Sequence, residues 1–210
     1  MKWILAWLLC VPLLAKEGAV ECGNLIYAGT RTSKCFSDEF LTTVQQKTSI
    51  ATERRFKAVK LSGDELFRIP FVIMTGEADF TLTAKERENL KSYLENGGFL
   101  LASASCSNAP WGKSFEREIR SIFGNEALKD IPMDHAMFRT VFTVKDLKLS
   151  HAGPTPTLKG ITHQGKIVVV YSPEGLNDSS HAENCCCCGG NEIQNAMEIN
   201  ANILAYALLH

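Results

Sequence analysis

The sequence predicts an α/β fold in which helices cover both faces of a mainly parallel β-sheet. Short runs that are apolar throughout recur along the chain, at Phe71–Thr75, Phe99–Ala104 and Ile167–Tyr171. Such runs are typical of parallel strands that are buried on both faces. Segments with helical periodicity and helix-start signals separate them, which favours alternation of strands and helices. The 210 residues, 45% of them hydrophobic, suit a single domain with a sizeable core.

The first third of the chain contains two further strand candidates. Residues Asn24–Gly29 form a short apolar segment, and Phe56–Leu61 form another. Between them, Asp38–Ile50 has the spacing of apolar residues expected of an amphipathic helix. A short helical turn is predicted over Asp64–Ile69, because Pro70 disfavours continuation of a helix.

Two helices are predicted in the middle of the chain. Thr83 and Glu86 have the spacing of a capping box, and Asn96-Gly97-Gly98 supplies the helix stop. The second helix is predicted over Ser114–Phe123, ending at Gly124, after a loop that begins beyond the strand at Phe99–Ala104.

The last third combines loops, antiparallel strands and a closing helix. Residues 125–165 are of mixed pattern, and a turn is predicted at His163-Gln164-Gly165-Lys166. The closing helix is predicted over Asn191–Leu209, with Asn191 as N-cap and Gln194 completing a capping box. Its expected buried stripe consists of Ile193, Met197, Leu204 and Leu208.

The N-terminus has the pattern of a secretory signal peptide. Met1-Lys2 is followed by the apolar run Trp3–Ala15, and cleavage is predicted after Ala15, or alternatively after Ala19. An uncleaved short anchor is the alternative. No Arg-Arg pair precedes the run, so we expect export of the unfolded chain to a periplasmic or secreted location.

Four adjacent cysteines, Cys185–Cys188, are followed by Gly189-Gly190. Successive side chains of an extended segment point to opposite faces, so one tetrahedral site requires the backbone to turn sharply there, which the glycines make easy. Without such a turn, the run suits several metal ions, a metal cluster, or a site whose sulfur ligands come partly from cysteines elsewhere in the chain. The chain has 8 cysteines; without Cys10 of the signal segment, seven remain, an odd number for simple disulfide pairing.

Other reactive side chains follow the predicted strands. Cys35 follows the first strand, Glu77 and Asp79 follow Phe71–Thr75, and Cys106 follows Phe99–Ala104. Ligands of open α/β sheets bind outside the carboxyl ends of the strands, and the cysteine run is expected at the same edge. Cys22, which precedes its strand, is expected at the opposite edge.

The leading hypothesis is a metal site made of thiolates. Cys185, Cys186, Cys187 and Cys188 supply the core ligands, and Cys106 or Cys35 completes the site. Thiolates select soft metals, so a transition metal is the expected cofactor: Cu(I) or Zn is favoured and an Fe–S cluster is the third option. The expected role is metal handling or redox chemistry.

Two alternatives compete with the metal site. In the first, the chain is a non-catalytic binding or assembly module whose protomers are linked by disulfides, as a homodimer or with an unknown protein partner. In the second, Cys106 is the nucleophile of an acyl-transfer enzyme, with His181 and Glu183 as base and orienting carboxylate. Against it, the segment from Ser105 to Pro110 is interpreted as a loose loop and not as a nucleophile elbow. A purely structural role is the remaining alternative, in which Cys22 forms a disulfide with Cys35 and the cysteines of the run form disulfides with one another.

Charge and hydropathy exclude several classes of protein. The net charge of −1 gives no electrostatic footprint for nucleic acid or an acidic membrane surface. The chain after the signal segment contains no run apolar enough to span a membrane, and no nucleotide cofactor is predicted.

Several motifs together resemble the bacterial domain-of-unknown-function 4159 family. The matching segments are Glu65-Leu66-Phe67-Arg68-Ile69-Pro70-Phe71, Thr75-Gly76, Phe80-Thr81-Leu82, Asn96-Gly97-Gly98-Phe99-Leu100, Phe115–Ile119, Pro132-Met133-Asp134-His135-Ala136-Met137-Phe138, Val169–Pro173 and Ala201–Leu208. The resemblance covers the chain from about residue 24, so we expect one domain over 24–210. It implies a flavodoxin-like fold similar to class I glutamine amidotransferases and assigns no biochemical role. This chain departs from the family at Gly76-Glu77-Ala78-Asp79, where the family often has Gly-His-Gly, and in the cysteine run.

Overall fold

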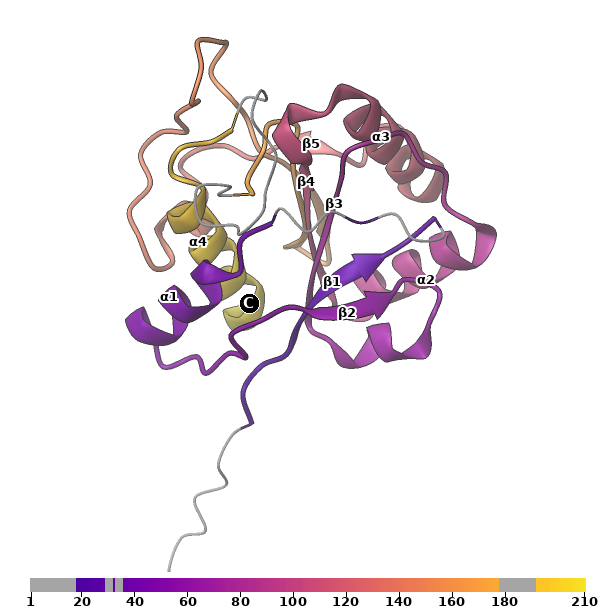
Figure 1. The fold of residues 1–210 in the computed structure, drawn as a ribbon, viewed down its shortest axis with the longest axis horizontal. Helices are drawn as coiled ribbons and strands as arrows, with labels where there is room; N and C mark the ends of the chain where they lie inside the picture. The colour runs from indigo at the N-terminus through magenta and orange to yellow at the C-terminus, as the bar shows by residue number, and fades with distance from the viewer. Residues whose placement is uncertain (1–17, 29–31, 33–35, 178–191) are drawn as a thin grey trace, which may run out of the picture.

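The computed structural model describes residues 18–28, 32, 36–177 and 192–210. They form one seven-stranded sheet, in the order β2-β1-β3-β4-β7-β6-β5, with four α-helices (Figure 1). The strands are β1 (Cys22–Ile26), β2 (Lys57–Lys60), β3 (Phe71–Gly76), β4 (Phe99–Ala104), β5 (Lys129–Asp130), β6 (Lys159–His163) and β7 (Lys166–Ser172). The helices are α1 (Glu39–Lys47), α2 (Ala84–Glu95), α3 (Ala109–Phe123) and α4 (Ala196–Leu209), with short 3₁₀ turns η1 (Asp64–Arg68), η2 (Ser105–Ser107) and η3 (Ala136–Arg139).

The sheet has a parallel part and a short antiparallel extension. Strands β2, β1, β3, β4 and β7 are parallel neighbours, which is the flavodoxin-like order, and the strand order reverses between β1 and β3. Strands β6 and β5 continue the sheet in antiparallel pairing. The turn between β6 and β7 places Gln164 and Gly165 at φ of 48° and 80°, as expected for a tight hairpin. The predicted α/β fold class is therefore confirmed.

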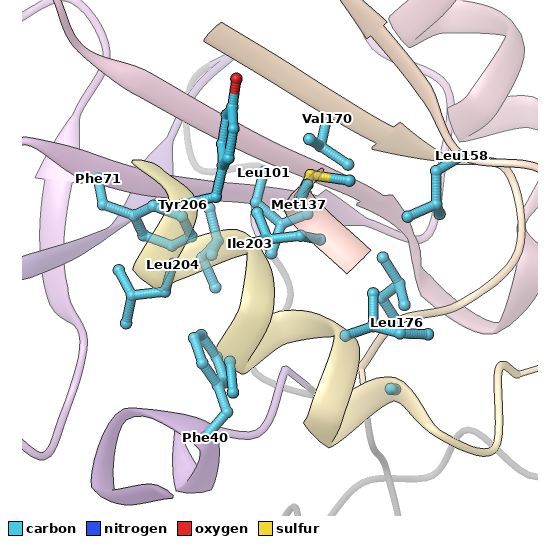
Figure 2. Close-up of a cluster of buried hydrophobic side chains, with 14 of the residues drawn as sticks. Phe40, Phe71, Leu101, Met137, Leu158, Val170, Leu176, Ile203, Leu204 and Tyr206 are labelled. Atoms are coloured by element: carbon cyan, nitrogen blue, oxygen red, sulfur yellow. The ribbon is translucent and has the colours of Figure 1, made fainter. Parts of the chain in front are cut away.

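Two hydrophobic clusters, one on each face of the sheet, hold the layers together. On one face α1 and α4 cover β3, β4 and β7, while α2 and α3 cover the other (Figure 1). Figure 2 shows the α4 face, where Phe71, Leu101 and Val170 from three neighbouring strands meet Ile203 and Leu204 of α4. Burying each such side chain stabilises the fold by about 1.5–3 kcal/mol.

Helix α2 begins with the capping box predicted from the sequence. Glu86 N donates to Thr83 Oγ1 at 3.2 Å, and Thr83 N donates to the Glu86 carboxylate at 2.8 Å. The other oxygen of that carboxylate accepts the Ala28 N–H at 2.8 Å. Glu86 therefore connects the start of α2 to the chain leaving β1.

Helix α3 begins earlier than predicted. It starts at Ala109, because Asn108 Oδ1 accepts the Trp111 N–H at 3.0 Å and Pro110 lies in the first turn. A proline is compatible with the first turn because the N–H groups there have no intrahelical acceptor. The expectation of a loop up to Ser114 is therefore wrong.

Helix α4 begins later than predicted, at Ala196. Glu192 and Ile193 pair instead with Gly175 and Leu149 as isolated β-bridges. The predicted single stripe is also wrong, because α4 is buried on nearly all sides. Helix α4 is 14 residues long. In the described part of the chain, no helix is both long enough and apolar enough to cross a membrane.

Candidate functional site at the carboxyl edge of the sheet

Most of the predicted site residues lie outside the described residues. This applies to Cys35, His181, Glu183 and Cys185–Cys188, whereas the backbone of Cys106 is described and forms part of η2. Within the described residues, no three His, Cys, Asp or Glu side chains lie close enough together to hold a metal ion. The metal site therefore stays a prediction, and the described residues show where its segments are attached.

A row of hydroxyl side chains crosses the sheet at the carboxyl ends of three strands. Thr75, Ser103 and Ser172 are register partners on β3, β4 and β7, and all three are completely buried. Residues two positions apart on a strand point to the same face of the sheet. Ile73, Leu101 and Val170, two positions before the three hydroxyl residues, belong to the cluster that packs against α4. The three hydroxyls therefore face α4 as well. The α4 face thus changes from apolar to polar at its carboxyl edge.

The hydroxyl row is bonded to the chain segments that cover it. Thr75 Oγ1 and Ser105 Oγ lie 2.8 Å apart, which connects β3 to the turn after β4. Ser103 Oγ accepts the Leu176 N–H at 2.8 Å. Asn200 of α4 donates its amide to the Leu176 carbonyl at 2.8 Å. The row therefore fixes the segment after β7 against both β4 and α4.

Three buried oxygen atoms in this region have no hydrogen-bond partner among the described residues. They are Ser172 Oγ, Glu174 Oε2 and Asn200 Oδ1. Leaving a buried acceptor unpaired costs about 1–3 kcal/mol, so unpaired buried groups concentrate where a protein binds something or holds ordered water. Among the residues that the structure describes, these three oxygen atoms at the exit of β7 are therefore free to accept further hydrogen bonds.

The residues that flank the cysteine-rich segment 178–191 are held together. Ile193 N donates to the Gly175 carbonyl at 2.8 Å. Asn177 donates its side-chain amide to Glu192 Oε1 at 3.2 Å and its backbone N–H to Glu192 Oε2 at 3.4 Å. Both ends of the segment therefore leave the fold at the same point of the carboxyl edge.

Asn177 also contacts the flank of the segment with Cys35 and, through Thr75, is connected to the flank of Cys106. Its carbonyl accepts the Ser37 N–H at 2.8 Å, and Ser37 follows Cys35 by two residues. Its Oδ1 accepts a long bond of 3.5 Å from Thr75 Oγ1. Thr75 in turn contacts Ser105, the residue before Cys106. Asn177 is therefore connected, directly or through Thr75, to residues beside all three cysteine-bearing segments.

The turn that contains Cys106 is tight. Only η2 and Asn108 separate the end of β4 from the start of α3, and Ser107 has a left-handed backbone with φ of 55°. The interpretation of this segment as a loose loop is therefore wrong. Helix α3 begins at Ala109, two residues after the end of this turn.

Cys22 lies away from this edge, as predicted. It is the first residue of β1, it is completely buried, and it is a free thiol. The alternative of a disulfide between Cys22 and Cys35 is therefore wrong, because the Cys22 thiol is free. Burial raises the pKa of Cys22 to about 12, so this thiol is neutral at physiological pH.

Glu77 and Asp79 are exposed at the exit of β3, as their position in the sequence predicts. His135 caps η3 through Nδ1, which accepts the Met137 N–H at 3.2 Å. Its ring packs edge-on against Tyr206. One nitrogen of His135 is therefore used in a structural turn.

The fold and the polar carboxyl edge define an α/β protein of flavodoxin-like topology. The family model described as "Domain of unknown function (DUF4159)" matches residues 25–208, so the chain belongs to that family. No curated protein matches the chain. The family confirms the resemblance found from the sequence and names no activity.

Several residues of the site were not expected from the sequence. The most important are Asn177, Thr75, Ser103 and Glu192. Glu192 was expected inside the closing helix, and Thr75 and Ser103 lie in strands that are otherwise apolar. A hydroxyl residue at the carboxyl end of each of two buried strands is the signal that could have indicated them.

Proposed function

We propose that this protein binds a soft transition metal through thiolates at the carboxyl edge of its sheet. Cys185, Cys186, Cys187 and Cys188 supply the core ligands, and Cys106 and Cys35 complete the coordination. The observation that carries the proposal is a hydrogen-bonded chain: Asn177 bonds Ser37 and Glu192 directly, and it is connected to Ser105 through Thr75. Ligand sites of this topology lie where the strand order reverses, here between β1 and β3, and the segment with Cys35 follows β1.

The proposed chemistry follows from the ligands. Thiolates prefer Cu(I), Zn(II) or iron–sulfur centres, and a contiguous run suits a multinuclear Cu(I) site better than the spaced pairs typical of zinc. With the proposed signal peptide, the metal is acquired after export in the periplasm or outside the cell, which favours Cu(I) or Zn over an Fe–S cluster. The role is metal handling or redox chemistry.

Elemental analysis of protein purified anaerobically and without chelators tests the proposal. The variant with Cys185 to Cys188 changed to serine is compared with the wild type, and C22S is the matched control. We expect stoichiometric metal in the wild type and C22S and none in the fourfold variant. Absence of metal in the wild type after reconstitution with copper, zinc and iron refutes the proposal. A dimer that a thiol reductant dissociates would then support the assembly module.

The tight turn after β4 favours acyl-transfer chemistry as a second candidate function. Cys106 lies between a strand and a helix N-terminus, the context in which nucleophiles are displayed. His181 and Glu183 remain the proposed base and orienting carboxylate. Selective labelling of Cys106 by an iodoacetamide probe, reduced in H181A, supports this candidate; labelling independent of His181 contradicts it.

A further inference from the structure

We infer that the cavity between the ends of α2 and α3 and the β6–β7 hairpin binds a short zwitterion with an apolar side chain, a free α-amino acid or a dipeptide. The cavity lies at the amino edge of the sheet, where β7 begins, on the face that α2 and α3 cover. All the residues that line it belong to the described part of the chain. The inference does not depend on the proposed metal site, which lies at the opposite edge.

The floor of the cavity is apolar. Leu94 from the last turn of α2, Ile161 of β6 and Val168 of β7 are buried members of one hydrophobic cluster, and Phe123 at the end of α3 packs against them. The cavity has a volume of about 390 Å³, within the range of pockets that hold small organic ligands. An apolar side chain placed on this floor is removed from water, which favours its binding.

Charged side chains of both signs form the rim, and the two signs come from different layers of the fold. Glu95, the last residue of α2, and Glu126, two residues after the cap of α3, are contributed by the helix layer. Lys129 of β5 and His163 of β6 are contributed by the sheet. A ligand on the floor therefore has carboxylates on one side and nitrogen donors on the other.

The ends of two helices add to the negative side. Helix α2 ends at Glu95 and helix α3 ends at Phe123, and both residues line the cavity. The last carbonyl groups of a helix have no intrahelical partner and carry partial negative charge, so they favour a cation. An ammonium group is therefore stabilised at the helix ends, whereas a carboxylate is stabilised beside Lys129, with the His163 imidazole as a second donor.

Two of the rim charges are available to a ligand, and their spacing limits its length. Glu95 pairs with Lys91, but the ion pairs among the described residues include neither Glu126 nor Lys129. Glu126 and Lys129 are three positions apart in the sequence, so their Cα atoms are separated by at most about 11 Å. A molecule that contacts both charges from the floor between them must be short, which favours an amino acid or a dipeptide over a long amphipathic ligand.

Isothermal titration calorimetry of the full chain with L-leucine tests the inference. Two analogues each lack one charge: 3-methylbutylamine lacks the carboxylate, and 4-methylpentanoate lacks the ammonium group. We expect saturable binding of L-leucine and binding of each analogue that is about tenfold weaker. Glycine keeps both charges without the apolar side chain and is also expected to bind about tenfold more weakly. L-Leucyl-L-leucine, titrated in parallel, distinguishes a dipeptide from a free amino acid as the preferred ligand.

Variants of the two available charges locate the site. E126Q is expected to weaken binding of L-leucine and of 3-methylbutylamine by about tenfold and to leave binding of 4-methylpentanoate unchanged. K129Q is expected to do the reverse with the two analogues. E88Q and K85Q are the matched controls, because Glu88 and Lys85 are exposed charges of α2 that do not line the cavity. All four substitutions are at exposed positions, so each variant is expected to fold.

The possible results separate clearly. Affinity for L-leucine that falls in E126Q and K129Q but not in E88Q and K85Q supports the site, and tighter binding of L-leucyl-L-leucine with the same dependence supports it with a dipeptide as the ligand. Absence of binding of both compounds at millimolar concentration overturns the inference. Binding that is unchanged in both E126Q and K129Q, or that is lowered equally in the two controls, overturns it as well.

Discussion

Asn177 donates two hydrogen bonds to the carboxylate of Glu192, one from its side chain at 3.2 Å and one from its backbone at 3.4 Å. These two residues flank the segment with the four cysteines, so their contact closes that segment at its base. Gly175 lies against the same carboxylate and forms a bridge with Glu192.

The substitution G175A is expected to break this contact. A Cβ on Gly175 would lie 2.0 Å from Glu192 Oε2, so the carboxylate must move away from Asn177. Overpacking of this kind lowers the free energy of unfolding by about 1–3 kcal/mol, measurable by urea denaturation. G63A is the control, since a Cβ there meets nothing closer than 3.4 Å, and it should be nearly neutral. Equal stability of G175A and the wild type would contradict the assigned role of Gly175.

The core strands were predictable because burial on both faces leaves a direct signature in the sequence. Strands β3 and β4 are buried at every position, and both were found within one residue of their true ends. The start of α2 was predictable because its capping box is local in sequence. These features depend on neighbouring residues alone, although the equally local Asn108 cap of α3 was missed.

Features that depend on tertiary contacts were missed. Asn191 and Gln194 have the spacing of a cap, but Glu192 is bound to Gly175 and Asn177, and this overrides the local preference. The hydroxyls of Thr75 and Ser103 become a row only through the register of two strands that are far apart in sequence. The sequence therefore indicated that the exits of the strands carry polar residues, but it did not identify the buried hydroxyls among them.

A buried carboxylate joins α2 to α3 and gives a second prediction. Glu118, whose side chain is 3% exposed, accepts from Arg87 Nε at 2.7 Å and pairs more weakly with Arg117 at 3.3 Å. R87A removes the closer hydrogen-bond donor of the buried Glu118 carboxylate, so we expect a loss of about 1–3 kcal/mol in urea denaturation. R117A should cost less than R87A, because Arg117 is 53% exposed and its contact with Glu118 is longer. A larger effect of R117A than of R87A would contradict this assignment.

The pKa of His135 predicts loss of stability on mild acidification. Burial lowers the pKa below its ordinary value of 6.5; nearby Arg139 and His210 act in the same direction and Asp134 opposes them. The unfolded chain therefore binds the proton more readily, and stability falls as pH decreases from about 6.5 towards the lowered pKa. H135N keeps a helix-capping side chain without this titration. The urea midpoint of H135N should decrease less between pH 7.5 and pH 5 than that of the wild type; parallel decreases would contradict the prediction.

Cys22 is predicted to be the least reactive cysteine of the described part of the chain. It is completely buried at the start of β1, and its pKa is raised to about 12, so the nucleophilic thiolate is nearly absent near neutral pH. Iodoacetamide at pH 8 should leave Cys22 unmodified in the native protein and modify it after unfolding in urea, as followed by mass spectrometry of its peptide.

The same shift predicts an alkaline limit to stability. The unfolded thiol ionises near pH 9, well below the pKa of about 12 in the folded protein, so the stability contributed by the neutral Cys22 thiol is lost progressively between these values. C22A removes this titration at the cost of a small cavity, so its urea midpoint should be lower than that of the wild type at pH 8, and the difference should shrink at pH 10. A constant difference between the two proteins, or rapid native alkylation of Cys22, would show that the start of β1 opens in solution.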